Sequence, residues 1–181
     1  MNLANLVTLA RLLAVPIIVW LLLSGEYVAT FWLFTLAGLS DAIDGFVAKR
    51  FDQRSELGAL LDPVADKTLI VSVFVTLGVA GHLPNWLVIL VVFRDLLIVG
   101  GFLLATALTQ PINWRPLIVS KLNTALQLVL VAGSLAQLAF GFDAQGTFVV
   151  LTYLVGATTV LSGGGYIVRW GRGLAGAELE S

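Results

Sequence analysis

Six long apolar runs alternate with short polar segments along the chain. Each run is close to the 20 or so residues that a helix needs to cross a bilayer. The runs cover about residues 3–23, 28–49, 57–80, 84–108, 117–142 and 147–170. Since lipid offers no partner to polar backbone groups, runs of this kind form helices. The pattern therefore predicts an all-α membrane protein with six transmembrane helices in a single domain, residues 1–181. The first helix could instead begin at Leu12, with an interfacial segment before it.

The composition supports the same conclusion. The 181 residues are 59% hydrophobic and only 12% charged, with a mean hydropathy of +0.98. Soluble domains are about half apolar and about a quarter charged, so the excess apolar surface must face lipid. The chain has no cysteine, which excludes disulfides and thiolate chemistry. It also has no basic patch with interleaved aromatic residues, so we expect no nucleic-acid partner.

The basic residues are unevenly distributed between the connecting segments. Lys49, Arg50 and Arg54 lie in the second connector and Arg115 in the fourth, whereas the first, third and fifth connectors contain no lysine or arginine. By the positive-inside rule, both termini and the even-numbered connectors face the cytoplasm. Nothing like a mitochondrial presequence precedes the first run, so we expect a bacterial inner membrane.

Four aspartates stand near the predicted ends of the second and third helices. Asp41 and Asp44 are three residues apart and Asp62 and Asp66 four apart, so each pair projects from one helix face. A tight antiparallel hairpin would bring the two pairs to one depth, facing each other. Carboxylates this close in a low-dielectric setting must be protonated, paired with bases or bound to cations. Oxygen-only ligands favour hard divalent ions such as Mg²⁺, Mn²⁺ or Ca²⁺.

A second explanation treats these acids as helix ends at a water interface, with Asp62 and Pro63 in a turn. Three small residues favour a ligand site instead. Gly45, Ala48 and Gly58 leave room beside the acids for close helix packing or for a flat ring. Acids within membrane helices are functional candidates by default.

These residues spell DxxDGxxA followed, after Lys49 and eight further residues, by GxxxDxxxD. The motif resembles the signature of the CDP-alcohol phosphatidyltransferases. The resemblance implies a homodimer of six-helix subunits that moves a phosphatidyl group from CDP-diacylglycerol to an alcohol and releases CMP. It also implies that the four aspartates bind two divalent cations, Mg²⁺ or Mn²⁺, and that Asp66 is the general base. The small residues bordering the cytidine diphosphate would be Gly45, Ala48 and Gly58.

Further residues on the nucleotide side follow from the same resemblance. The family usually has arginine where this chain has Lys49, so either Lys49 or Arg50 contacts a nucleotide phosphate. The N-terminal ANLVTLAR resembles the family's opening motif and adds Asn5, Thr8 and Arg11. Taken without the family, Thr8 and Arg11 suit interfacial anchors equally well.

Later stretches, FRDLLIVGG and SKLNTALQLVLVAGSLA, look most like the CMP-forming cardiolipin synthase branch of the family. This implies an acceptor site for phosphatidylglycerol built from Arg94, Lys121, Asn123 and Thr124. Arg94 could instead form a structural ion pair with Asp95, and Lys121 could extend to lipid head groups. Phosphatidylglycerophosphate synthases share similar stretches, so glycerol 3-phosphate is the alternative acceptor.

The expected chemistry is direct displacement, in which the acceptor hydroxyl loses its proton while the bond to CMP breaks and two metal ions stabilise both oxygens. His82 is the only histidine and lies in a connector expected on the other membrane face, which argues against a histidine nucleophile. A divalent-cation carrier is a distant alternative. Carriers place their acids near the membrane midplane, whereas these cluster by one face.

Overall fold

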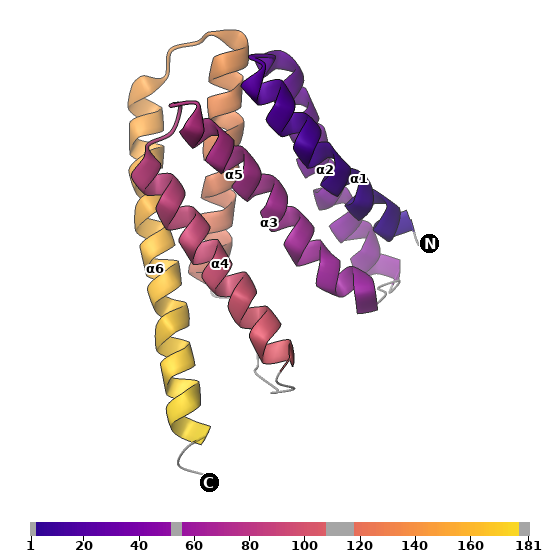
Figure 1. Ribbon diagram of the computed structural model, residues 1–181, viewed down its shortest axis with the longest axis vertical. Coiled ribbons are helices and arrows are strands. Elements are labelled where there is room, and N and C mark those ends of the chain that lie inside the picture. Colours follow the sequence, from indigo (N-terminus) through magenta and orange to yellow (C-terminus); the bar gives the residue numbers. More distant parts are fainter. Residues whose placement is uncertain (1–2, 52–55, 108–117, 178–181) are drawn as a thin grey trace.

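The computed structural model describes residues 3–51, 56–107 and 118–177, with side chains at residues 9–40, 67–101 and 118–168. Apart from short connectors, this part of the chain forms six helices (Figure 1). They are α1 (Leu3–Leu23), α2 (Tyr27–Phe51), α3 (Glu56–Val79), α4 (Asn85–Ala107), α5 (Ile118–Phe140) and α6 (Gln145–Ala177). The all-α prediction is confirmed, and the bounds agree with the apolar runs to within a few residues. The exception is α6, which continues past Trp170 to Ala177.

The first helix is continuous from Leu3 to Leu23 and contains Pro16. The described chain therefore has no break at Leu12 that would set off a separate first segment. Whether the first turns of α1 lie along a membrane interface stays a prediction.

The helices run alternately in opposite directions, so their ends gather at two ends of the molecule (Figure 1). The short connectors after α1, α3 and α5 lie at one end, called here the connector end, and the chain begins and ends toward the other, called here the terminal end. Gly25 and Gly81 each close a helix with a positive φ, 79° and 77°. At the second of these caps the His82 amide donates to the Leu77 carbonyl at 2.8 Å, as in a Schellman motif.

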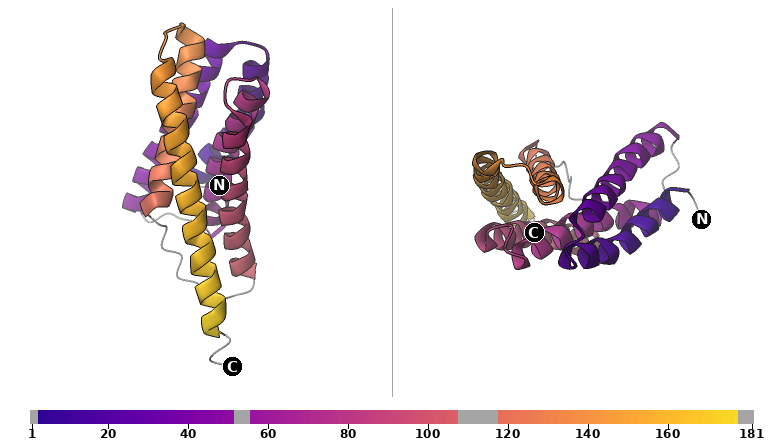
Figure 2. Two further views of the ribbon diagram at one scale, coloured as in Figure 1. Left: turned by 90° about the vertical axis from the view of Figure 1, so that its left-hand side faces the viewer. Right: turned by 90° about the horizontal axis from the view of Figure 1, so that it is seen from above.

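The two helices that carry the acids, α2 and α3, pack against several other helices of the bundle. In the described contacts α2 packs against α1 and α5, and α3 packs against α1, α4 and, less extensively, α5. The two helices follow each other in antiparallel directions, and whether they pair tightly at the acid positions stays a prediction, because those side chains lie outside the described part. On the other side, α6 packs against α4 and α5 and projects beyond the other helices at the terminal end (Figure 2).

The apolar core formed by the described side chains lies toward the connector end. Its fully buried side chains include Ile18 of α1, Phe74 of α3, Leu87 of α4 and Leu130 of α5. Along α3, the described buried apolar positions begin at Leu69. The acid-bearing half of α3 therefore lies on the terminal side of the described core.

Large apolar side chains also cover much of the outer surface. Trp20 is 65% exposed, Phe93 63% and Ile118 85%, and similar residues lie on every helix whose side chains are described. Contiguous apolar surface of this extent indicates contact with lipid or with another chain rather than with water.

Two helical stretches in the described part, Ile118–Phe140 and Gln145–Val168, are long and apolar enough by themselves to cross a bilayer. Shorter apolar stretches lie in the first three helices, at Leu9–Leu23, Tyr27–Ser40 and Lys67–Val79. Length and composition therefore support two spans directly, and the count of six spans stays a prediction.

Gly156 of α6 allows a close approach to α4. A Cβ atom at this position would lie 2.8 Å from the ring of Trp86. We expect Gly156→Ala to lower the Tm, at a cost of about 1–3 kcal/mol, because the indole must shift within a packed interface. Gly164→Ala on the same helix is the control, since no atom lies within 4 Å of the added carbon. Circular dichroism melts in detergent measure both, and equal Tm values for the two variants would contradict the packing of α4 on α6.

Candidate functional site

The four aspartates occupy helix positions, although their side chains lie outside the described part. Asp41 and Asp44 belong to α2, and Asp62 and Asp66 belong to α3. Each pair lies roughly 6 to 10 residues from the helix end on the terminal side, or about 9–15 Å at 1.5 Å per residue. Measured along their helices, the two pairs therefore lie at a similar distance from the terminal end.

Pro63 lies inside α3, which is continuous from Glu56 to Val79. The turn at Asp62 and Pro63 that formed part of the alternative explanation is therefore wrong, whereas a place for these acids at a water interface is not tested by the helix. The predicted nucleotide-side residues also belong to helices, with side chains outside the described part: Asn5, Thr8, Gly45, Ala48, Lys49, Arg50 and Gly58.

A cavity of about 450 Å³ lies between α1, α2, α3 and α5. The residues that contribute polar groups to its lining are Arg11, Ser120, Lys121 and Thr124. The remaining lining is apolar or small and comes from Gly38, Leu69, Ile70, Ala125 and Leu128. An apolar lining with a few polar groups suits an amphipathic ligand.

Helical spacing connects this cavity with the acid positions. Gly38 lies three residues before Asp41 on α2, and Ile70 lies four residues after Asp66 on α3. Residues three or four apart share a helix face. The positions of Asp41 and Asp66 therefore lie on the faces of α2 and α3 that line the cavity.

Two cationic side chains line the cavity from different helices. Arg11 of α1 is only 5% exposed, and Lys121 lies in the first turn of α5. Guanidinium and ammonium groups beside an apolar wall are typical of sites that hold a phosphate. The sequence assigns Arg11 to the nucleotide side and Lys121 and Thr124 to the acceptor side, and the structure brings the three to one cavity.

Gly38, Ile70 and Ser120 line the cavity but are not among the site residues predicted from the sequence. Helical spacing from Asp41 and Asp66 is a signal that could have found the first two. Ser120 lies four residues before Thr124, so the same spacing from a predicted acceptor residue could have found it.

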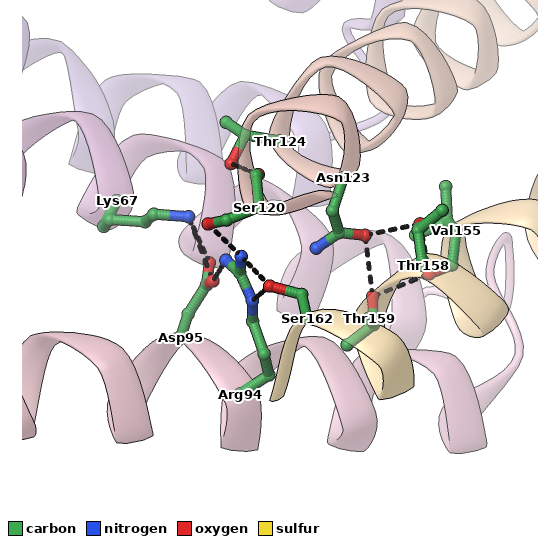
Figure 3. A network of polar contacts seen from close by, with 10 residues as sticks. All are labelled: Lys67, Arg94, Asp95, Ser120, Asn123, Thr124, Val155, Thr158, Thr159 and Ser162. Carbon is green, nitrogen blue, oxygen red and sulfur yellow. Dashed lines mark hydrogen bonds and ion pairs between the residues drawn. The ribbon is translucent and has the colours of Figure 1, made fainter. Parts of the chain in front are cut away.

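Arg94 and Asp95 form a buried ion pair. Nη1 of Arg94 lies 2.6 Å from Oδ1 of Asp95, and both side chains are 2% exposed. Nη2 of Arg94 donates to Oγ of Ser120 at 2.5 Å and to Oγ of Ser162 at 2.6 Å. Figure 3 shows Nζ of Lys67 approaching Asp95 from the other side, 2.9 and 3.0 Å from its two oxygens. These contacts support the ion-pair alternative for Arg94, and its role in acceptor binding stays a prediction.

Asn123 and Thr124 face different parts of the bundle. Asn123 is fully buried, and its Oδ1 accepts hydrogen bonds from Thr158 at 2.8 Å and Thr159 at 2.9 Å on α6 (Figure 3). Thr124 lines the cavity, and its hydroxyl donates to the Ser120 carbonyl at 3.1 Å. Of the two predicted acceptor residues, Thr124 is therefore placed to meet a ligand, whereas the Asn123 oxygen holds α5 to α6.

A divalent cation at the acid positions stays a prediction. Among the side chains that the structure describes, no group of three or more His, Cys, Asp or Glu residues could hold a metal ion. Four carboxylates supply only oxygen ligands, the set that Mg²⁺ and Mn²⁺ prefer. Because two of the acid positions share helix faces with the walls of a cavity that also carries Arg11 and Lys121, a metal there would lie beside a phosphate site.

His82 lies at the opposite end of the molecule from the acids, as the sequence predicts. It lines a second cavity of about 490 Å³ at the connector end, together with Ser134 and Asp143. About 20 Å of α3, at 1.5 Å per residue, separates Asp66 from that end. The histidine is therefore too far from the acids to act with them.

Comparisons with known proteins agree with the motif. A family model described as CDP-alcohol phosphatidyltransferase matches residues 1–161. The chain is 37% identical over 188 residues to the chloroplastic CDP-diacylglycerol–glycerol-3-phosphate 3-phosphatidyltransferase 1 of Oryza sativa subsp. japonica, covering 94% of this chain and 57% of that one. It is 32% identical over 178 residues to the cardiolipin synthase (CMP-forming) of Homo sapiens, covering 90% and 59%.

A bacterial relative is matched over more of its length. The chain is 31% identical over 185 residues to a probable phosphatidylglycerophosphate synthase of Mycobacterium tuberculosis, covering 97% of this chain and 84% of that one. By contrast, the chain spans less than two thirds of the rice and human relatives. Relatives of both acceptor types thus occur at similar identity.

Removing the carboxylate between Arg94 and Lys67 should destabilise the fold strongly. Asp95→Ala takes their shared anion away, and breaking a buried ion pair typically costs about 3–5 kcal/mol. Asp143→Ala is the matched control, because it removes an exposed carboxylate whose Oδ1 accepts only from the Gln145 amide, at 3.1 Å. Such a capping bond is worth about 1 kcal/mol. Thermal unfolding of both variants in detergent should give a much lower Tm for Asp95→Ala, and similar values would refute the buried pair.

Proposed function

The chain belongs to the CDP-alcohol phosphatidyltransferase family, and we propose that it transfers the phosphatidyl group of CDP-diacylglycerol to phosphatidylglycerol, forming cardiolipin and releasing CMP. The observation that carries this proposal is the cavity lined by Arg11 and Lys121. The faces of α2 and α3 that border it also carry the positions of Asp41 and Asp66. The cationic side chains of Arg11 and Lys121, which would bind phosphate, and the acids are therefore assigned to one site.

The reaction exchanges one phosphorus–oxygen bond for another. The oxygen of the acceptor hydroxyl bonds to the phosphatidyl phosphorus of CDP-diacylglycerol, and the bond from that phosphorus to the bridging oxygen breaks. CMP leaves with the bridging oxygen and its electron pair. No covalent intermediate with the protein is needed, because both substrates are held together in one site.

The protein's own groups bind, orient and take the proton. Arg11 and Lys121 hold phosphates at the cavity wall, and Asp66 accepts the proton of the attacking hydroxyl. Two divalent cations, Mg²⁺ or Mn²⁺, when bound by the four aspartates, supply positive charge to the attacking and leaving oxygens. Leu69, Ile70 and Leu128 form an apolar wall that would contact the acyl chains of a lipid substrate.

The apolar wall also favours a lipid acceptor. Phosphatidylglycerol carries its hydroxyl beside a phosphate and two acyl chains, and a cavity with two cations and several apolar side chains suits such a molecule. Glycerol 3-phosphate, which is small and fully polar, gains nothing from those side chains. It remains the alternative acceptor, since relatives described as phosphatidylglycerophosphate synthases match the chain equally well.

We further propose that all six helices span a bacterial inner membrane as a homodimer, with the terminal end toward the cytoplasm. The exposed apolar surface and the family support membrane insertion. The uneven distribution of Lys and Arg supports the orientation. CDP-diacylglycerol then reaches the acids from the cytoplasmic leaflet.

An acceptor panel tests the proposal. Purified protein supplied with CDP-diacylglycerol, Mg²⁺ or Mn²⁺ and phosphatidylglycerol should release CMP and form cardiolipin, which thin-layer chromatography separates. Product with glycerol 3-phosphate but not with phosphatidylglycerol would establish the alternative acceptor. Metal flux into vesicles without CMP release would instead indicate a divalent-cation carrier.

Asp66→Asn should abolish transfer while the protein stays folded, because an amide keeps the shape of the side chain but cannot take a proton. We expect a loss of at least about 100-fold in kcat, the lower end of what general bases contribute. Asp143→Asn, which makes the same change at the connector end, should retain full activity. Full activity in Asp66→Asn would remove Asp66 from the role of general base.

A further inference from the structure

We propose that Lys67, Asp95 and Arg94 are positioning residues, which hold the acid pair of α3 at a fixed distance from the cavity wall of α5. This inference rests on the proposed function, because it concerns the same site. In this role the three residues set the distance between site residues on α3 and α5, and they do not themselves bind the metal or the substrates.

The first link fixes α3 beside the acids. Lys67 directly follows Asp66, and its Nζ contacts both oxygens of Asp95 on α4 at 2.9 and 3.0 Å. Leu69, two residues further along, is 3% exposed and belongs to the apolar core. One residue corresponds to about 100° of rotation and 1.5 Å of rise. The contact therefore sets the rotation and height of α3 one residue from Asp66.

The second link reaches the cavity. Oδ1 of Asp95 accepts from Nη1 of Arg94 at 2.6 Å, and Nη2 of Arg94 donates to Oγ of Ser120 at 2.5 Å. Ser120 lines the cavity, and so does its neighbour Lys121. Figure 3 shows these contacts running in sequence from α3 through α4 to α5. Each end of this sequence of contacts lies one residue from a proposed site residue, Asp66 at one end and Lys121 at the other.

Stability alone does not account for such a cluster. Replacing a buried ion pair by apolar side chains of similar volume is often neutral or stabilising, because desolvation of the charges offsets their attraction. Apolar contacts are non-directional, so they distinguish rotations of a helix only through shape. A carboxylate that meets two cations in fixed directions does discriminate. The geometry therefore points to a positioning role, in which the cluster fixes the distance between the acid pair of α3 and the cavity wall of α5.

The test uses Lys67→Met, which keeps the apolar stem and leaves Arg94 and Asp95 as a neutral pair. The full-length protein in detergent is titrated with Mn²⁺ in the presence of CDP, and free Mn²⁺ is measured by electron paramagnetic resonance. Groups that orient metal ligands typically contribute about 10- to 100-fold to metal affinity or activity. We therefore expect Mn²⁺ to bind about 10-fold more weakly or worse, with a matching fall in kcat.

Two further variants separate positioning from general destabilisation. Thr159→Val removes a buried hydrogen bond between α5 and α6, where Asn123 keeps its bond from Thr158. It should lower the Tm about as much as Lys67→Met while leaving Mn²⁺ binding unchanged. Lys67→Arg keeps the charge opposite Asp95 and should restore most of the Mn²⁺ affinity.

The Asp95→Asn variant tests whether the loss of Mn²⁺ affinity depends on the contact between Lys67 and Asp95 rather than on Lys67 alone. If it folds, it should weaken Mn²⁺ binding as Lys67→Met does, and the double variant should be no worse than either. Where Asp95→Asn does not fold, Lys67→Met and Lys67→Arg decide the matter.

The outcomes also separate this inference from the proposed function. Wild-type protein and Lys67→Met that bind Mn²⁺ equally well, whatever their Tm, overturn the positioning role. Wild-type protein that releases no CMP from CDP-diacylglycerol overturns the proposed function, and the Mn²⁺ titration still reports on the spacing of the acids. Wild-type protein that binds no Mn²⁺ leaves nothing to position and overturns the inference as well.

Discussion

A charged side chain buried among apolar helices needs an oppositely charged partner, and this requirement determines how the polar groups of the bundle are arranged. Arg94 and Asp95 are both 2% exposed and satisfy each other directly, and Lys67 shares the same carboxylate. The remaining polar groups of Arg94 reach hydroxyls on α5 and α6. A single cluster thus connects four of the six helices in a bundle whose other described contacts are mostly apolar.

The cluster lies between described apolar packing and the proposed site. Toward the connector end, the helices pack through buried apolar side chains such as Phe74 and Leu87. Toward the terminal end lie the cavity, with Arg11 and Lys121 in its lining, and the four acid positions. The cluster therefore joins the described core to the helix segments that carry the proposed site.

Local features of the fold were predictable from the sequence, and long-range ones were not. Apolar runs located all six helices, and the spacing of Asp41 and Asp44 placed both on one helix face. By contrast, Lys67 and Asp95 are 28 residues apart, and Arg94 and Ser162 are 68 apart, so nothing in the local sequence indicates their contact. The packing of α1 against both α2 and α3 is likewise a long-range feature that the local sequence does not indicate.

Two of the predicted acceptor residues, Asn123 and Thr124, show that sequence also fails to predict which way neighbouring side chains face in the bundle. Asn123 and Thr124 are neighbours on α5, so their side chains must point about 100° apart. The sequence gives the angle between the two side chains. It does not give the rotation of α5 about its own axis, which depends on packing against α6. As a result Thr124 lines the cavity and Asn123 meets Thr158 and Thr159.

We propose that the acids of α2 and α3 share one metal-dependent nucleotide site with Arg11 and Lys121. The most direct test is anomalous diffraction from crystals grown with Mn²⁺ and CDP. We expect manganese peaks among Asp41, Asp44, Asp62 and Asp66, with the diphosphate between them and the two cations of the cavity. Manganese bound elsewhere, or acids directed away from that cavity with CDP at another place, would contradict it.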